Sequence, residues 1–194
     1  MKTKNILLLQ GVTSSGKTQI YINLIREYLI AGKQVLYLLP EIALTTQIIG
    51  RLKKYFGPVT QVYHSRLSDN DKLDIWLKAG ERDIEKRSGL ILGVRSSVFL
   101  PFADPGLIIV DEEHDGSYKQ HDPAPRYHAR DSAIMLASFT GALTLLGSAT
   151  PSVESYYNAA SGKYGFAELK ERYGRVNLPE IILVNTREAY RKRL

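Results

Sequence analysis

Short apolar runs alternate along the chain with segments whose apolar residues recur at helical spacing. Six apolar runs predict strands, at residues 6–9, 35–39, 59–63, 90–94, 107–110 and 143–146. Five helical patterns lie between or after them, at residues 18–30, 44–56, 68–86, 128–139 and 152–160. Strands that lack strict polar alternation and are spaced by helices are typical of a parallel sheet covered on both faces. We therefore expect an α/β fold with a mostly parallel central sheet and helices on both faces.

The helix predicted at residues 68–86 carries a clear amphipathic pattern. Its start resembles a capping box, with Ser68 followed three residues later by Asp71. Four apolar side chains then fall on one face of the helix, namely Leu73, Trp76, Leu77 and Ile84. An amphipathic helix normally turns such a face to the core.

The composition is that of one globular domain. The 194 residues are 44% hydrophobic and 24% charged, which is enough to bury a substantial core. The lack of cysteine excludes a disulfide framework and a thiolate zinc site within the chain. We see neither a run of membrane-spanning length nor a signal peptide before the first strand, so we expect a cytoplasmic protein with no membrane partner.

The net charge of +6 is a weak argument for a nucleic-acid partner. Residues 170–194 hold seven basic and three acidic side chains, and this segment supplies most of the excess. The remainder of the chain is nearly neutral. Nucleic-acid binding must therefore be argued from particular residues.

Residues 11–18, GVTSSGKT, match the spacing of a phosphate-binding P-loop. They follow a predicted strand and open a predicted helix, which is the context that the motif requires. The glycines allow main-chain amides to point at phosphate oxygens, Lys17 neutralises the β- and γ-phosphates, and the Thr18 hydroxyl binds Mg²⁺. The alternative is a chance glycine-rich turn. The predicted ATP contacts are Gly11, Val12, Thr13, Ser14, Ser15, Gly16, Lys17 and Thr18.

Residues 107–114, LIIVDEEH, form a buried-strand pattern that ends in a cluster of carboxylates. Asp111 is expected to hold Mg²⁺, directly or through water, and Glu112 to orient and deprotonate the attacking water. A solvated acidic turn is the alternative, although such crowding of like charges is unfavourable without a cation. Together with the P-loop, this motif predicts hydrolysis of a nucleoside triphosphate with Lys17, Asp111 and Glu112 as catalytic residues.

Two further features carry less information. His114, His121 and His128 recur at seven-residue intervals, but Pro123 and Pro125 exclude a single helix here, so a zinc site is not favoured. Residues 147–152, GSATPS, follow another buried strand. Taken alone, they describe an ordinary strand–turn–helix connection.

The segment 116–130, GSYKQHDPAPRYHAR, interleaves aromatic and basic residues. Tyr118 and Tyr127 offer stacking faces, and Lys119, Arg126 and Arg130 offer phosphate contacts, as a sequence-indifferent single-strand contact requires. A surface loop whose tyrosines pack on the domain fits the same composition equally well.

Taken in order, these motifs resemble the first motor lobe of superfamily-two DNA helicases, and more narrowly that of the bacterial helicases that restart replication at stalled forks. The resemblance spans nearly the whole chain. It rests on residues 11–18, 39–45 (LPEIALT), 63–65 (YHS), 93–97 (GVRSS) with Phe99, 111–115 (DEEHD), 117–120 (SYKQ), 125–131 (PRYHARD) and 147–152. It implies a RecA-like P-loop NTPase fold that uses ATP and Mg²⁺.

The resemblance also implies roles for residues that the pattern alone leaves open. The residues implied to lie along the DNA path are Pro40, Glu41, Leu44, Thr45, Arg95 and Ser96. The loop implied to sense single-stranded DNA contributes Tyr118, Lys119, Arg126, Tyr127 and Arg130. The residues implied to couple nucleotide state to DNA binding are Glu113, His114, Ser148 and Thr150.

By the same resemblance, residues 1–180 form the ATP-binding lobe, and residues 181–194 form a final edge strand and the basic start of a linker to a second lobe. Translocation from 3′ to 5′ on single-stranded and forked DNA is implied, in a bacterial, nucleoid-associated protein. The implied partners are that second lobe, primosome proteins and single-strand-binding protein.

The chain departs from the family pattern in several places. Ser14 stands where glycine is usual and Gln19 where glutamate is common. We find no base-gripping segment before the first strand, no second lobe with its arginine finger and no cysteine-rich zinc module, so zinc is not carried over. We therefore expect this chain alone to bind nucleotide and to be nearly inactive. The rival interpretations are a P-loop phosphotransferase and a passive DNA-binding module.

Overall fold

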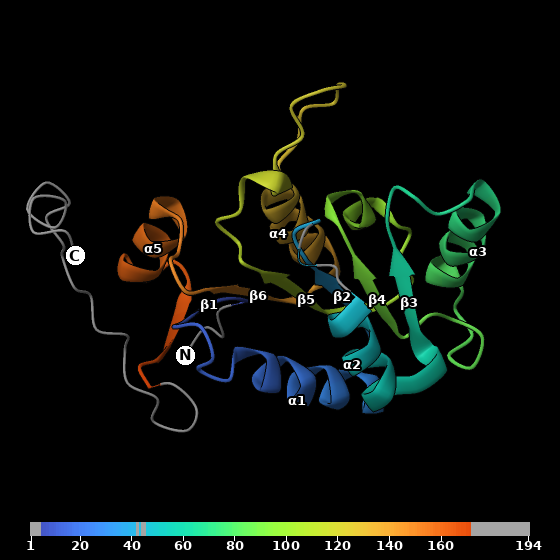
Figure 1. Cartoon of the computed structure of the whole chain (residues 1–194), viewed down its shortest axis with the longest axis horizontal. Helices are drawn as coiled ribbons and strands as arrows, with labels where there is room; N and C mark the ends of the chain where they lie inside the picture. The colour runs from blue at the N-terminus through green and yellow to red at the C-terminus, as the bar shows by residue number, and fades with distance from the viewer. Residues whose placement is uncertain (1–4, 42, 44–45, 172–194) are drawn as a thin grey trace, which may run out of the picture.

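The computed structural model describes residues 5–41, 43 and 46–171 of the chain. Within this part, seven strands form one sheet in the spatial order β3-β4-β2-β5-β6-β1-β7, and every neighbouring pair is parallel (Figure 1). The strands are β1 (Ile6–Gly11), β2 (Gln34–Leu38), β3 (Thr60–Tyr63), β4 (Leu90–Gly93), β5 (Pro105–Asp111), β6 (Leu143–Ser148) and β7 (Gly165–Leu169). Because all strands run in one direction, the loops at their carboxyl ends gather at one edge of the sheet, where ligands of such folds bind.

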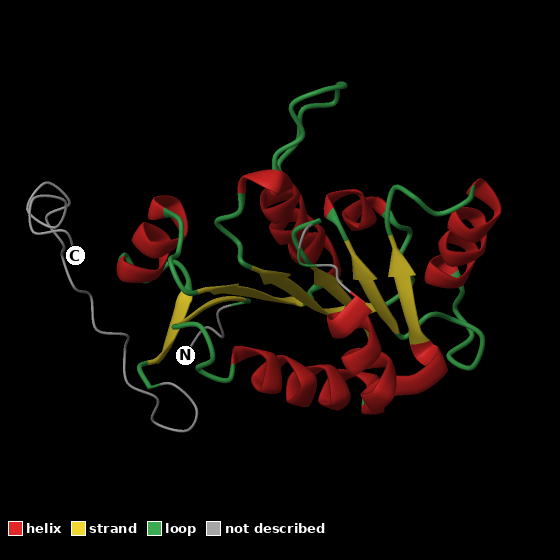
Figure 2. Ribbon diagram, viewed as in Figure 1, coloured by secondary structure: helices red, strands yellow, loops and turns green. Residues whose placement is uncertain are grey.

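Helices cover both faces of the sheet (Figure 2). One face carries α1 (Lys17–Ile30) and α2 (Thr46–Phe56), and the other carries α3 (Asp69–Gly80), α4 (Ala129–Thr140) and α5 (Val153–Ala160). Three short 3₁₀ helices complete the described part: η1 (Gly57–Val59), η2 (Arg95–Phe99) and η3 (Gly116–Tyr118). Within the described residues, we find no helix with the length and apolar character needed to cross a membrane.

Alternate side chains of the central strands serve two separate cores. In β2, Leu36 and Leu38 pack against the α3 and α4 side, whereas Val35 and Tyr37 pack against the α1 and α2 side. All four side chains are fully buried. Burial on both faces explains why this strand reads as an unbroken apolar run rather than an alternating one.

The predicted α/β class and parallel sheet are confirmed, and each of the six predicted strands is present. The structure adds β7, which pairs with β1 and lies at the edge of the sheet formed by the described strands. Its sequence, GFAEL, is short, begins with glycine and contains a glutamate, so it carries no strong strand signal.

The prediction for residues 68–86 is wrong in two respects, the first being length. The helix starts as expected, with the Ser68 side chain accepting from the Asp71 amide, but it ends at Gly80. The carbonyl of Ala79 accepts from the main-chain amide of Ala103 and the side-chain amide of Gln34. These tertiary partners take the place of the helical hydrogen bonds that would have continued the helix.

The second error concerns the buried face of this helix. Ile75 and Ala79 pack into the core, whereas Leu73, Trp76 and Leu77 are 47–62% exposed. Ile84 lies beyond the end of the helix and is also exposed. The prediction followed the larger apolar side chains, whereas the core contact is made by one isoleucine and one alanine close to the sheet.

Some predictions lie outside the described residues. They concern Leu44 and Thr45, and the strand and linker at residues 181–194 with their boundary at residue 180.

The inverted face of α3 gives a stability prediction. Ile75→Ala removes a side chain that is 5% exposed and should lower the free energy of unfolding by about 2–4 kcal/mol, as for other buried large-to-small changes. Leu77→Ala, on the same helix but 62% exposed, should change it by less than about 0.5 kcal/mol. Urea unfolding followed by circular dichroism measures both. Equal losses for the two variants would contradict the observed orientation.

Candidate nucleotide-binding site

The predicted P-loop forms the turn between β1 and α1 and borders an open pocket of about 180 Å³. The pocket is lined by residues 12–18 together with Asp111 and Glu112. Strand β6 lies between β1 and β5 in the sheet, so the two loops face each other across one strand. The structure therefore brings the two predicted catalytic segments to a single pocket.

Backbone conformation explains the small residues of the P-loop. A Cβ atom at Gly11 would lie 2.6 Å from the Ser15 hydroxyl oxygen, and Gly16 has φ of +96°. Ser14 also lies in the left-handed region, with φ of +65°. This conformation costs an L-residue about 1–2 kcal/mol, so the serine that departs from the family pattern stores strain at the pocket.

Lys17 begins α1 and is largely buried. Its Nζ donates a hydrogen bond to the Gly11 carbonyl at 2.7 Å and lies 3.9 Å from Glu112 Oε1. The ammonium group is thus held at the pocket between the loop and the acidic strand end. The structure thus places Lys17 at the pocket, and its role in phosphate binding stays a prediction.

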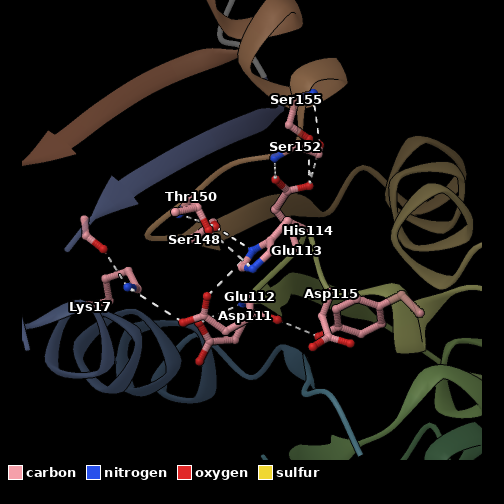
Figure 3. A network of polar contacts seen from close by, with 12 residues as sticks. Lys17, Asp111, Glu112, Glu113, His114, Asp115, Ser148, Thr150, Ser152 and Ser155 are labelled. Atoms are coloured by element: carbon pink, nitrogen blue, oxygen red, sulfur yellow. Dashed lines mark hydrogen bonds and ion pairs between the residues drawn. The ribbon is translucent and has the colours of Figure 1, made fainter. Parts of the chain in front are cut away.

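Three consecutive carboxylates at the end of β5 point in different directions (Figure 3). Glu112 adopts a left-handed backbone conformation with φ of +46°. Its carboxylate faces the P-loop lysine and also lies 3.8 Å from His114 Nδ1. Asp111 and Glu113 each contact a different part of the fold. The irregular backbone here is what separates the three charges.

Asp111 lies between two tyrosine hydroxyls. Tyr21, on α1, donates to Oδ1 at 3.1 Å, and Tyr37, on β2, donates to Oδ2 at 2.9 Å. Burial, the largest influence, raises the pKa of Asp111, while the hydrogen bonds from the tyrosines oppose that rise. Sequence reasoning missed both tyrosines because it read them as ordinary apolar positions of a helix and a strand.

Glu113 is fully buried and joins β5 to α4 and α5. Its Oε1 accepts from the Ser152 amide at 2.7 Å, and its Oε2 accepts from the Ser155 hydroxyl at 2.8 Å. Arg130 completes the cluster with a hydrogen-bonded ion pair of 3.0 Å to Oε2. A buried carboxylate needs such partners, because an unpaired buried charge is strongly destabilising.

His114 connects the acidic strand end with the loop after β6 (Figure 3). Its Nδ1 lies 2.8 Å from the Ser148 hydroxyl and its Nε2 lies 3.4 Å from the Thr150 hydroxyl. The structure thus brings together His114, Ser148 and Thr150, three of the four residues that resemblance implied as coupling residues, whereas the Glu113 side chain contacts Arg130, Ser152 and Ser155. Among the described residues, no three His, Cys, Asp or Glu side chains are grouped so that they could hold a metal ion.

Two predicted DNA contacts require correction, because the fold uses these side chains internally. Tyr118 is fully buried, and its hydroxyl lies 2.6 Å from the Asp111 carbonyl oxygen and 3.1 Å from that of Leu38. Its ring is not available for base stacking. Arg130 is 12% exposed, and its guanidinium is directed to Glu113 rather than to solvent.

The other predicted DNA contacts lie around the carboxyl edge of the sheet. Tyr127 packs edge-on against Phe99 with ring centroids 4.7 Å apart. Lys119 donates to the Arg126 carbonyl, and the Arg126 side chain itself is exposed. Arg95 donates to the Ser117 carbonyl at 3.2 Å.

Three more of the predicted DNA contacts follow strands β2 and β4. Glu41 and Ser96 are exposed, whereas Pro40 is buried. Glu41 lines a second polar pocket with His64 and Arg66. Among the residues that sequence analysis assigned to DNA, Glu41, Ser96 and Arg126 are thus exposed in the structure.

A parallel sheet with a P-loop after one strand, facing a carboxylate cluster at the end of another, defines a RecA-like P-loop NTPase domain. Comparison with known families agrees, because a family model described as "DEAD/DEAH box helicase" matches residues 1–159. The chain belongs to the DEAD/DEAH box helicase family.

Curated relatives from several bacteria share the name "Replication restart protein PriA". The chain is 45% identical over 186 residues to the protein of that name from Bacillus subtilis (strain 168), covering 96% of this chain and 22% of the relative. It is 49% identical over 170 residues to that of Haemophilus influenzae, covering 88% and 23%. It is 47% identical over 178 residues to that of Chlamydia pneumoniae, covering 92% and 23%. The chain thus spans less than a quarter of the length of these three relatives.

The buried Glu113–Arg130 pair gives a second stability prediction. Glu113→Ala leaves the guanidinium without its buried partner and should lower the free energy of unfolding by about 3–5 kcal/mol. Asp104→Ala breaks the ion pair with Lys33, whose side chains are 46% and 44% exposed, and should cost less than about 1 kcal/mol. Chemical denaturation compares the two. A Glu113 variant as stable as the Asp104 variant would show that the pair does not hold the fold.

Replacement of Asp111, in contrast to that of Glu113, should increase the free energy of unfolding. Since burial raises the pKa of Asp111 in the folded chain above the ordinary value of an aspartate carboxyl, the folded state loses stability as pH rises above that ordinary value and the carboxyl ionises. Asp111→Asn should therefore unfold at a higher urea concentration than wild type at pH 7, and the difference should shrink toward pH 4. Urea titrations at the two pH values measure it, and a less stable variant at pH 7 would refute it.

Proposed function

We propose that this chain is the ATP-binding motor lobe of a DNA helicase that acts in replication restart. The observation that carries the proposal is the single pocket in which Lys17 lies 3.9 Å from Glu112, beside a complete P-loop. Family membership supports the helicase class. The name shared by the curated relatives supports replication restart as the process.

The pocket residues have different proposed roles in binding and hydrolysing ATP. Main-chain amides of residues 13–18 and the amino terminus of α1 bind the phosphates, and Lys17 neutralises their charge. Glu112 is free of the tyrosine and arginine contacts that occupy its two neighbours, so it is the carboxylate available to orient and deprotonate water. Thr18 and Asp111 offer the hydroxyl and carboxylate oxygens that suit Mg²⁺, which would screen the phosphate charge when bound.

Coupling between nucleotide and DNA is proposed to pass through His114. Its side chain touches the loop after β6 through Ser148 and Thr150 and lies within 3.8 Å of Glu112. Glu113, which directly precedes His114 in the sequence, contacts Arg130 at the start of α4 and Ser152 at the start of α5. A shift of the acidic strand end would therefore move both the β6 loop and the elements that flank the DNA surface.

The DNA surface is proposed to follow the exposed groups of the carboxyl edge. Arg95, Arg126 and Lys119 supply positive charge for phosphates, and Tyr127 with Phe99 supplies an aromatic surface for bases. Glu41 and Ser96 lie on the same edge. Tyr118 and Arg130 are left out because their side chains are held inside the domain.

The rest of the mechanism is proposed to need partners beyond this chain. The relatives are more than four times longer than the part this chain matches, which leaves room for a second lobe with an arginine finger. Such a finger is worth about 10³–10⁵ in rate, so this chain alone should bind nucleotide and turn over slowly. Unwinding from 3′ to 5′, single-stranded and forked DNA as substrates, primosome proteins and single-strand-binding protein as partners, and a cytoplasmic, nucleoid-associated location complete the proposal.

Two rival functions make different demands. A P-loop phosphotransferase would transfer phosphate to a nucleoside acceptor, and membership of the helicase family argues against it. A passive DNA-binding module would bind single-stranded DNA with an affinity indifferent to nucleotide. The intact Lys17, Thr18, Asp111 and Glu112 around one pocket argue against it.

Nucleotide binding tests the proposal directly. Titration of the chain with a fluorescent ADP analogue and Mg²⁺ should show saturable binding, and Lys17→Ala should weaken it at least 10-fold because the phosphate-neutralising charge is lost. Lys86→Ala, which removes an exposed lysine away from the pocket, should leave the affinity unchanged. The affinity for a labelled oligothymidylate should differ between nucleotide-free and nucleotide-bound chain. DNA affinity that ignores nucleotide, together with no effect of Lys17→Ala, would favour the passive module instead.

A further inference from the structure

Two tyrosines that no sequence motif contains hold the catalytic aspartate. Tyr21 comes from the first turns of α1, directly after the P-loop, and Tyr37 lies near the carboxyl end of β2. Their hydroxyls reach opposite oxygens of Asp111, at 3.1 Å on Oδ1 and 2.9 Å on Oδ2. The carboxylate is therefore held from two sides by groups that lie 90 and 74 residues away in the sequence.

Packing gives these hydroxyls little freedom to move. Both tyrosines are fully buried, and their rings meet edge-to-face with centroids 5.6 Å apart. Gly147, on β6, makes room for Tyr21, because a Cβ atom at this position would overlap the tyrosine hydroxyl. Burial, the largest influence, raises the pKa of both phenols, so they remain neutral donors.

The hydrogen bonds to the Asp111 carboxylate leave one acceptor position unused. A carboxylate offers about four acceptor positions, two on each oxygen. Oδ1 accepts from Tyr21 and also from the Glu112 amide at 3.1 Å. Oδ2 accepts from Tyr37, which leaves this oxygen with capacity for one further donor or cation. The side chain can therefore offer one acceptor direction to the pocket it lines.

We propose that Tyr21 and Tyr37 are positioning residues that fix the Asp111 carboxylate so that Oδ2 alone serves Mg²⁺ or its bound water. The inference rests on the proposed function, because it assumes that Asp111 serves a metal–nucleotide complex. It concerns neighbours of the expected metal-binding group, whose replacement in other proteins typically costs 10–100-fold in metal affinity. The pair acts by geometry and does not itself contact nucleotide.

The experiment measures metal dependence of binding rather than turnover. The chain is titrated with a fluorescent ADP analogue in excess EDTA and again across a series of MgCl₂ concentrations. Tyr21→Phe and Tyr37→Phe should each raise the Mg²⁺ concentration for half-maximal tightening about 10-fold or more, while the affinity in EDTA stays within about 2-fold. Selective loss of the metal-dependent part is the expected signature, because a merely structural role would change both affinities together.

Tyr118→Phe is the matched control. It also removes a hydroxyl from a fully buried tyrosine next to Asp111, but that hydroxyl donates to the main-chain carbonyls of Asp111 and Leu38 and leaves the hydrogen bonds to the Asp111 carboxylate in place. Its Mg²⁺ dependence should stay at the wild-type value even if its melting temperature falls. Tyr21→Phe and Tyr37→Phe variants with the Mg²⁺ dependence of this control would overturn the positioning role while leaving the proposed function intact.

A second comparison keeps the test decisive if a single variant folds poorly. In an Asp111→Asn background, Tyr37→Phe should cause no further change in Mg²⁺ dependence, since the carboxylate it positions is gone. An additional loss of the same size as in wild type would overturn the inference. A wild-type chain that binds no nucleotide with or without Mg²⁺ would overturn the proposed function and this inference together.

Discussion

The site depends on keeping three adjacent carboxylates apart at the end of β5. Unscreened like charges at such spacing would raise one another's pKa and destabilise the strand end. The structure gives each one its own environment: tyrosine hydroxyls for Asp111, a lysine for Glu112, and an arginine with two serines for Glu113. The left-handed conformation at Glu112 makes this division possible. Each of the three carboxylates therefore has its own partners within the protein.

The three environments also account for a division of roles. Glu113 is fully enclosed and acts as a structural centre that joins β5, α4 and α5. Glu112 is the most accessible of the three and faces the pocket. Asp111 is intermediate, with its carboxylate held by the domain but bordering the same pocket. Buried polar networks of this kind rigidify a site when every member is satisfied, which is what a lobe that must position a nucleotide requires.

Local sequence signals were sufficient for much of this architecture, and their failures have a common cause. The P-loop and the acidic strand end were predictable because their chemistry lies in consecutive residues. Tyr118 was misread because its aromatic and basic neighbours suit a DNA contact, whereas its burial follows from carbonyls of β2 and β5 that no local pattern reveals. The buried face of α3 was predicted wrongly because the pattern follows the largest apolar side chains. The side chains that reach the core are instead those of one isoleucine and one alanine, which lie on the side of the helix toward the sheet. Partners distant in sequence decided each case.

The close approach of Tyr21 to Gly147 makes the residue type at one position depend on the residue type at the other. Glycine is needed at position 147 because the hydroxyl of Tyr21, from α1, occupies the space that a Cβ atom would fill, not because of a special backbone angle. Among divergent relatives, a residue with a Cβ at this point of β6 should accompany a shorter side chain at the helix position that Tyr21 occupies. Such paired replacement would mark lineages in which the aspartate is oriented by different means, and it would be visible in aligned sequences as covariation between the two sites.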